Sequence, residues 1–285
     1  MCDAGQHAPT GRSVPVPVAD PNDSRILAYR AVRDRDLAGR PGRFVAEGSV
    51  VVRTLLSGRC RFRVESILVA DHRLAAEAAL LSAAPPDVPV YVADRAVMDG
   101  IVGFSVHRGL LAVGIREPEP EAASLLPPPG RPALVLGLVG IANHDNVGGL
   151  FRNAAAFGAD AVLLDGTSCD PLYRKAIRVS VGAALTMPFR RGGSEDALVE
   201  TLVAAGFEPV ALGPRGRERV DRMAWPARTA LLVGAEGSGL PEHLLGRLRS
   251  ARIAMAPGFD SLNVATAAAI ALQAARSAAT DPADD

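Results

Sequence analysis

The sequence predicts an α/β protein made of two domains, on three observations. A chain of 285 residues is longer than one typical domain of about 100–150 residues. Continuous apolar runs, such as 133–139, alternate with stretches of helical periodicity. Such runs are typical of strands buried on both faces of a mainly parallel sheet. A proline-rich break at 117–131 then separates a smaller N-terminal α/β domain from a larger C-terminal one, whose sheet is flanked by helices.

The composition excludes several classes of protein. Hydrophobic residues make up 48% of the chain and charged residues 22%, which is ordinary for a globular protein. The 31 basic residues balance 31 acidic ones, so the net charge gives no broad attraction to nucleic acid and any such contact must come from local patches. Cys2, Cys60 and Cys169 are too few and too widely spaced to predict a disulfide framework or a zinc site. The cysteines thus give no reason to expect a metal. The N-terminus has no signal peptide and no apolar run reaches ~18 residues, so we expect a cytoplasmic protein with no membrane contact.

The N-terminal half predicts a flexible tail followed by a small domain. Residues 1–22 follow neither a helical nor a strand period, so we place them outside the fold as a tail. Residues 23–116 form the expected domain, opening with a helix from Asp23. The elements expected after it are strand 44–46, helix 50–56, strand 64–69, helix 73–81, strand 88–92 and strand 110–115.

The C-terminal half predicts a larger α/β domain over residues 132–280, after a linker at 117–131 and before a tail at 281–285. Proline prevents regular helix or central-strand structure in the linker. The four expected strands are the apolar runs 133–139, 161–164, 209–212 and 230–233. The expected crossover helices are 147–157, 197–205 and 262–279.

The first candidate site is the loop 143–152, which follows the apolar run 133–139 and leads into a helix. A helix N-terminus offers unpaired N–H groups to an anion, and Gly148 and Gly149 permit close approach of a ligand. Arg152 would point back towards the same opening. Alternatively, Asn146 caps the helix, the glycines form a turn and Arg152 is merely solvated. The loop matches neither the P-loop nor the dinucleotide-binding pattern.

Two further loops follow later apolar segments. In the loop 234–241, three glycines expose backbone groups that can bind the edges of a heterocycle, although a tight strand–helix connection would also use them. The loop 253–264 leads into an alanine-rich helix. There Ser261 is a candidate N-cap, and Asp260 would be favourable near the positive helix end. The ends of parallel strands meet at one edge of a sheet, so the three loops are expected to converge.

Together these loops resemble the SpoU, or TrmH-like, family of RNA 2′-O-methyltransferases of the SPOUT class. The stretch 143–152 resembles the family's first motif, 234–240 its second and 253–264 its third. The resemblance extends to 170–182 between the motifs, and 44–48 resembles the start of the family's L30e-like RNA substrate-binding domain.

The sequence departs from the family pattern at two places. His144 and Asp145 stand where members often carry Pro-Gly, and Ala254 replaces a common proline. Neither change removes a reacting group. The family resemblance implies a deep trefoil knot in the C-terminal domain and a homodimer formed through that domain. It also implies rRNA or tRNA as the substrate.

The resemblance also implies the roles of particular residues. S-adenosylmethionine would be the methyl donor, and its expected binding residues are Gly234, Glu236, Gly237, Ile253, Met255, Leu262 and Asn263. For Ile253 and Leu262, ordinary core packing is an alternative role, compatible with donor binding. The expected catalytic residues are Arg152 and Asn146, with Glu236, Ser261 and Asn263 organising the pocket.

Arg152 is the leading catalytic candidate, yet a guanidinium stays protonated in proteins and is a poor general base. Our hypothesis is that Arg152 holds a phosphate and stabilises the developing alkoxide, while Asn146 orients the ribose. Glu236 is a less favoured candidate for a direct base.

Two other functions compete with methyl transfer. One is a catalytically inactive RNA-binding scaffold, against which the intact Arg152 and all three loops argue. The other is a nucleotide-dependent α/β enzyme, against which the missing phosphate-loop lysine and dinucleotide pattern argue.

Overall fold

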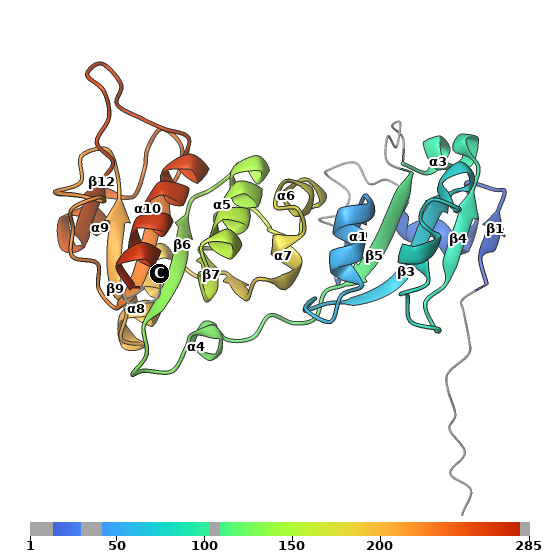
Figure 1. Ribbon diagram of the computed structural model, residues 1–285, viewed down its shortest axis with the longest axis horizontal. Helices are drawn as coiled ribbons and strands as arrows, with labels where there is room; N and C mark the ends of the chain where they lie inside the picture. The colour runs from blue at the N-terminus through green and yellow to red at the C-terminus, as the bar shows by residue number, and fades with distance from the viewer. Residues whose placement is uncertain (1–13, 30–41, 103–108, 280–285) are drawn as a thin grey trace, which may run out of the picture. The chain divides into compact units, whose positions relative to one another are not determined.

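The computed structural model describes residues 14–29, 42–102 and 109–279 of the chain (Figure 1). It divides into two compact units, with the boundary between Arg116 and Glu117. Unit 1 is the N-terminal part and unit 2 the C-terminal part.

Unit 1 is an α/β unit around one mixed sheet. Its strands lie in the order β1-β4-β3-β5-β2, with β1, β4 and β3 parallel to one another and β5 antiparallel to both β3 and β2. Its elements are β1 (Val16–Val18), η1 (Ser24–Tyr29), β2 (Arg43–Glu47), α1 (Ser49–Leu55), β3 (Arg63–Ala70), η3 (Asp71–Arg73), α2 (Ala78–Leu81), β4 (Val90–Ala93), α3 (Arg95–Val102) and β5 (Leu110–Ile115).

The expectation that residues 1–22 form a tail outside the fold was wrong for the described part of that segment. Strand β1 pairs with β4 in parallel, and Val18 is buried in the core of unit 1 beside Ile26 and Tyr29. Pro17 has no N–H to donate, which suits the edge position that β1 occupies in the sheet. Three residues among prolines carry too little periodicity to predict a strand. Residues 1–13 lie outside the described residues.

Two helices expected in unit 1 are shorter than the sequence suggested. The helix expected from Asp23 is a 3₁₀ helix over Ser24–Tyr29, and its expected continuation lies outside the described residues. Its last residue is fully buried, and the Tyr29 hydroxyl lies 2.8 Å from Ser66 Oγ. The helix expected over 73–81 is divided into η3 and α2.

Unit 2 contains a larger sheet with helices on its flanks. Its elements are α4 (Ala122–Leu125), β6 (Ala133–Val139), α5 (His144–Ala156), β7 (Ala161–Leu164), α6 (Arg174–Val179), α7 (Ala183–Thr186), β8 (Phe189–Arg191), α8 (Glu195–Ala204), β9 (Glu208–Leu212), β10 (Glu218–Arg219), β11 (Arg228–Gly234), α9 (Glu242–Arg247), β12 (Arg249–Arg252) and α10 (Val264–Ala279).

The sheet of unit 2 is parallel at every described strand pair, in the order β10-β12-β9-β11-β6-β7-β8. All seven residues of β6 are buried, as a strand covered on both faces requires. One face of β6 packs with residues of α8 and α9 in a shared core. Helices α5 and α10 contact each other, and on the face of the sheet turned to the viewer in Figure 1 α5 also contacts β7 and α10 contacts β11. The predicted parallel sheet flanked by helices is confirmed.

The segment 117–131, expected to be a linker, packs on unit 2 instead. It contains the short helix α4, and Leu126 joins the core beneath the sheet. The backbone N–H of Arg191 donates to the Glu119 carboxylate at 2.7 Å, and Arg228 Nη2 donates to the Pro127 carbonyl at 2.9 Å. The prolines leave several carbonyls without helical partners, and arginine side chains satisfy them.

No helix among residues 14–29, 42–102 and 109–279 is long and apolar enough to cross a membrane. The cellular location of the protein stays a prediction.

Helix α6 ends in an unusual way. The N–H of Gly182 donates to the Ile177 carbonyl at 3.0 Å and the N–H of Val181 to the Arg178 carbonyl at 3.1 Å, which is the Schellman pattern. The residue after the cap in this pattern is normally glycine, because it adopts a left-handed conformation. Here it is Val181, with φ +55°, and its side chain is 40% exposed. A β-branched residue in this conformation is strained.

We therefore predict that Val181→Gly stabilises unit 2. The change removes a steric cost of roughly 1–2 kcal/mol and adds a backbone entropy cost of roughly 0.5–1 kcal/mol, so a net gain near 0.5–1 kcal/mol is expected. Urea unfolding followed by Trp225 fluorescence measures it, since this single tryptophan lies in unit 2.

The matched control for this substitution is Val203→Gly. Val203 is also exposed, but it lies in the last turn of α8, where its backbone is already helical and glycine should destabilise by roughly 0.5 kcal/mol. If both variants lose stability to the same extent, Val181 is not strained.

Candidate functional site

The order of the strands in unit 2 places a crevice between β6 and β11. From β6 the sheet continues through β7 to β8 on one side, and through β11 to β9 on the other. In an open parallel sheet, the connections leave in opposite directions at such a switch point, and ligands bind outside the carboxyl ends of the strands there. The loops after β6 and β11 are the first and second loops identified in the sequence.

A cavity of about 420 Å³ lies at this switch point. Its volume is in the range of small-molecule sites. Two loops supply its walls, and the lining residues are Gly140, Ile141, Ala142, Asn143, His144, Asn146, Ala235 and Glu236. The first and second loops therefore meet, as the sequence predicted.

The Asp165 carboxylate, which follows β7, holds the loop after β6 in place. Its Oδ1 accepts hydrogen bonds from the Gly140 N–H at 3.1 Å and the Ser168 N–H at 2.9 Å, and its Oδ2 accepts from the Thr167 hydroxyl. Ser168 Oγ in turn accepts from the Ile141 N–H at 3.0 Å. This network fixes Gly140, whose φ of +68° favours glycine, at the wall of the cavity.

The same network sets the charge of Asp165, which is 2% exposed. Burial acts to raise the pKa of this carboxyl, but hydrogen bonds from Ser168, Thr167 and Gly140 outweigh it and hold the pKa below its ordinary value of 3.8. Asp165 therefore stays ionised and keeps its acceptors available to the loop.

Helix α5 is capped by Asn143, whose side chain accepts a hydrogen bond from the Asp145 N–H at 2.8 Å. The alternative in which Asn146 caps the helix was wrong. Asn146 lies within the first turn, is only 5% exposed, and lines the cavity. A buried amide at a cavity wall is available to orient a bound group.

Asn263 joins all three loops. Its Oδ1 accepts from the N–H groups of Ala265 at 2.9 Å and Thr266 at 3.3 Å, which caps α10. Its Nδ2 donates to Asn146 Oδ1 at 2.9 Å and to Glu236 Oε1 at 3.3 Å. The expectation that Ser261 is the N-cap was wrong, because α10 begins two residues later than expected.

The second loop folds back on itself directly after β11. Ala235 and Gly239 form an isolated antiparallel bridge, and Gly234 is buried beneath it. A Cβ on Gly234 would lie 2.2 Å from the carbonyl carbon of Gly239 and 2.3 Å from the N atom of Leu240. Only glycine allows this approach of two backbone segments. The approach places Ala235 and Glu236 at the cavity.

The remaining predicted residues are not among those that line the cavity. Arg152 is exposed on α5 and has no hydrogen-bond or ion-pair partner among the described residues. In the third loop, Ile253 and Met255 are half-buried, whereas Leu262 is 44% exposed. Gly237 and Ser261 are exposed as well. The structure thus brings Asn146, Glu236 and Asn263 together, and it does not place Arg152 among the residues that line the cavity.

Sequence reasoning missed part of the cavity wall. Gly140, Ile141 and Ala142 carry no reactive group, and they line the cavity through their position directly after β6. The network of Asp165 was missed too, although small polar residues at 165–168 follow an apolar strand in the same way as the recognised loops.

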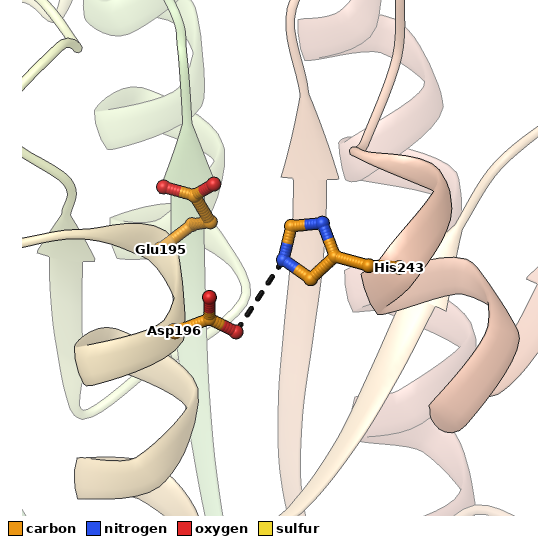
Figure 2. Close-up of side chains that lie close together, drawn as sticks. All are labelled: Glu195, Asp196 and His243. Carbon is orange, nitrogen blue, oxygen red and sulfur yellow. Dashed lines mark ion pairs between the residues drawn. The ribbon is translucent and has the colours of Figure 1, made fainter.

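Three side chains of metal-binding types also lie together at the first turns of α8 and α9, as Figure 2 shows: Glu195, Asp196 and His243. Asp196 Oδ1 already pairs with His243 Nε2 at 3.4 Å and with Arg247 Nη2 at 2.6 Å. The guanidinium therefore already offsets the charge of Asp196. Ion pairing between the two helices therefore accounts for this cluster.

The cavity lies at the switch point of a parallel sheet and is walled by the loops after β6 and β11. The protein is therefore of the α/β class that binds a ligand at the carboxyl edge of an open parallel sheet. Comparison with known proteins identifies the family within this class. The sequence model of the SpoU rRNA Methylase family matches residues 133–273. An uncharacterized tRNA/rRNA methyltransferase from Mycobacterium bovis is 40% identical over 266 residues, covering 89% of each chain. The chain belongs to the SpoU family of RNA methyltransferases.

Solved structures share the fold. An AdoMet-bound rRNA methyltransferase from Sinorhizobium meliloti is 22% identical, with a TM-score of 0.77 over 92% of this chain and 98% of that one. A crystal structure of an RNA 2′-O ribose methyltransferase is 27% identical, with a TM-score of 0.74 over 91% of this chain and 98% of that one.

We predict that Asp165→Asn loosens the loop after β6. The amide cannot accept from all the donors around it, so the free energy of unfolding should fall by about 1–3 kcal/mol at neutral pH. The pKa of Asp165 is lower in the folded chain than the ordinary value of 3.8. The carboxylate therefore contributes its full stabilisation of the fold above about pH 3.8, and this contribution is lost as the pH falls through the lower pKa of the folded chain.

Urea unfolding followed by Trp225 fluorescence at a series of pH values measures this effect. The difference in free energy of unfolding between the native chain and Asp165→Asn should be constant around neutral pH and should shrink to near zero in acid. A gap that stays constant down to the most acidic pH would show that the carboxylate charge does not hold the loop. Asp221→Asn is the matched control, since this carboxylate pairs with Arg219 at the surface.

Proposed function

We propose that the protein transfers a methyl group from S-adenosylmethionine to a ribose 2′-hydroxyl of rRNA or tRNA. The observation that carries the proposal is the Asn263 carboxamide, which draws Asn146 and Glu236 together at the cavity. The similarity to a crystallised RNA 2′-O ribose methyltransferase supports the ribose hydroxyl as the acceptor.

The residues at the switch point fit the methyl donor. The cavity of about 420 Å³ is lined in part by Gly140, Ala142 and Ala235, whose short or absent side chains leave backbone groups that can bond the edges of a heterocycle. Gly234, Gly237, Ile253, Met255 and Leu262 would complete the binding site from the second and third loops. When bound, the donor supplies an electrophilic methyl group.

The chain's own task is to place the ribose hydroxyl and to accommodate its proton. Asn146, buried with its Oδ1 held by Asn263, has a fixed amide plane at the cavity wall and would orient the ribose. Arg152 stays protonated, so it would hold a neighbouring phosphate and stabilise charge on the hydroxyl oxygen, while a phosphate oxygen or water takes the proton.

Glu236 and Ser261 have supporting roles in this proposal. Glu236 is exposed and accepts a hydrogen bond from Asn263, which suits an anchor between two loops better than a proton acceptor. Ser261 lies in the exposed third loop and would help to close the pocket.

The proposal includes the remaining family properties. Unit 1 would bind the substrate RNA as an L30e-like domain, and unit 2 would carry the trefoil knot and form a homodimer. No metal is needed for the transfer. The contacts of α10 with α5 and β11, which bring the last helix back against earlier elements of unit 2, support the knot in this proposal.

The test of the function is incorporation of labelled methyl groups into total RNA, followed by nucleoside mapping. Unmodified rRNA and tRNA fractions are incubated separately with the protein and labelled S-adenosylmethionine. The label is expected in 2′-O-methylated nucleosides of one fraction. Label on a base would overturn the ribose assignment, and RNA binding without label would favour the scaffold function.

In the same assay, we predict that Arg152→Lys binds the donor like the native chain but loses most of its turnover. Lysine keeps the charge and loses the two-pronged geometry that suits phosphate. Calorimetry with S-adenosylmethionine measures donor binding, and initial rates measure turnover. Arg219→Lys, which replaces a half-buried arginine that pairs with Asp221 and does not line the cavity, is the matched control. Nearly full activity of Arg152→Lys would contradict the positioning role.

We also predict that Gly234→Ala weakens donor binding tenfold or more. The added methyl group meets the backbone of Gly239 and Leu240, so the second loop must move away from the cavity. Gly213→Ala is the matched control, because a Cβ there meets no atom within 4 Å. Calorimetry with S-adenosylmethionine measures both variants. Equal affinities would show that the second loop does not hold the donor.

A further inference from the structure

Two aromatic rings are stacked beside the cavity. The imidazole of His144 and the phenol of Tyr173 have centroids 3.8 Å apart and planes inclined by 30°. His144 is the first residue of α5, and Tyr173 directly precedes α6. The pair therefore joins the loops that follow the neighbouring strands β6 and β7.

His144 is the member of the stacked pair that reaches the cavity. It is one of the residues that line the cavity, whereas Tyr173 is not, and both residues are half-buried. Beside the rings, Lys175 Nζ and Asp145 Oδ2 form an ion pair at 2.7 Å. One face of the imidazole is thus covered by the phenol, and the start of α5 is tied to the start of α6 at two points.

We propose that the stacked pair of His144 and Tyr173 is a platform on which the base of the target nucleotide stacks. The proposal rests on the proposed function, because it concerns the same substrate. A ribose oriented by Asn146 carries its base one bond away, and His144 is two residues before Asn146 on the same wall. Stacking on an aromatic face is the usual way for a protein to hold an unpaired base.

The alternative is that the rings only tie α6 to α5. If the rings only hold the two helices together, losing the stack should lower stability, donor affinity and RNA affinity together. If the rings are a platform, losing the stack should weaken RNA binding and leave the affinity for S-adenosylmethionine unchanged. The two roles therefore differ in their kinetic signatures. An apolar but non-aromatic side chain at residue 144 separates them, since it can pack against Tyr173 without offering a ring face.

The experiment compares His144→Leu with His144→Phe in the methylation assay, using whichever RNA fraction the native chain methylates. His144→Leu is expected to raise KM for RNA about tenfold, since stacking of one base is worth roughly 1–3 kcal/mol. Its affinity for S-adenosylmethionine and its urea midpoint should remain near native values. His144→Phe should restore most of the RNA affinity.

The matched control is His243→Leu, an exposed histidine of α9 in the same unit, which should leave KM unchanged. The platform is overturned if His144→Leu keeps a native KM, or if His144→Phe fails as badly as His144→Leu. It is also overturned if His144→Leu lowers stability and donor affinity in parallel with RNA affinity. Failure of the native chain to methylate either fraction would instead overturn the proposed function.

Discussion

The arrangement of the site depends on one side chain amide. Asn263 uses its oxygen to cap α10 and its nitrogen to bind Asn146 and Glu236, which lie 117 and 27 residues away in the sequence. Each bond contributes only about 0.5–1.5 kcal/mol. These bonds matter mainly because they position side chains. The cap fixes the Asn263 amide relative to α10, and the amide then fixes Asn146 and Glu236.

A second constraint comes from the sheet. Because β6, β7 and β11 run parallel, the loops after them leave the same edge, and the ionised Asp165 after β7 can bind the backbone after β6. The cavity wall is therefore set by backbone positions and by a buried carboxylate that does not line it. Substitutions that preserve every cavity-lining side chain can still deform the wall by disturbing that support.

The sequence predicted those elements whose burial leaves a clear signal. The runs 133–139 and 161–164 were found because both faces of these strands are covered. Strand β12, with the sequence Arg-Ser-Ala-Arg, was missed because only its pairing with β9 and β10 makes it a strand. Both helix caps were misplaced, since Asn, Asp and Ser crowd the starts of α5 and α10, and only the hydrogen bonds identify the residue that caps.

The position of Arg152 bears on the size of the substrate. Asn146 and Arg152 lie six residues apart on α5, so they are separated by about 9 Å along the axis and point in different directions. Asn146 faces the cavity, and Arg152 faces solvent. A small molecule held in the cavity would contact the first and not the second. A polynucleotide, with one ribose at Asn146 and its phosphates outside, can reach both, and this geometry suits RNA.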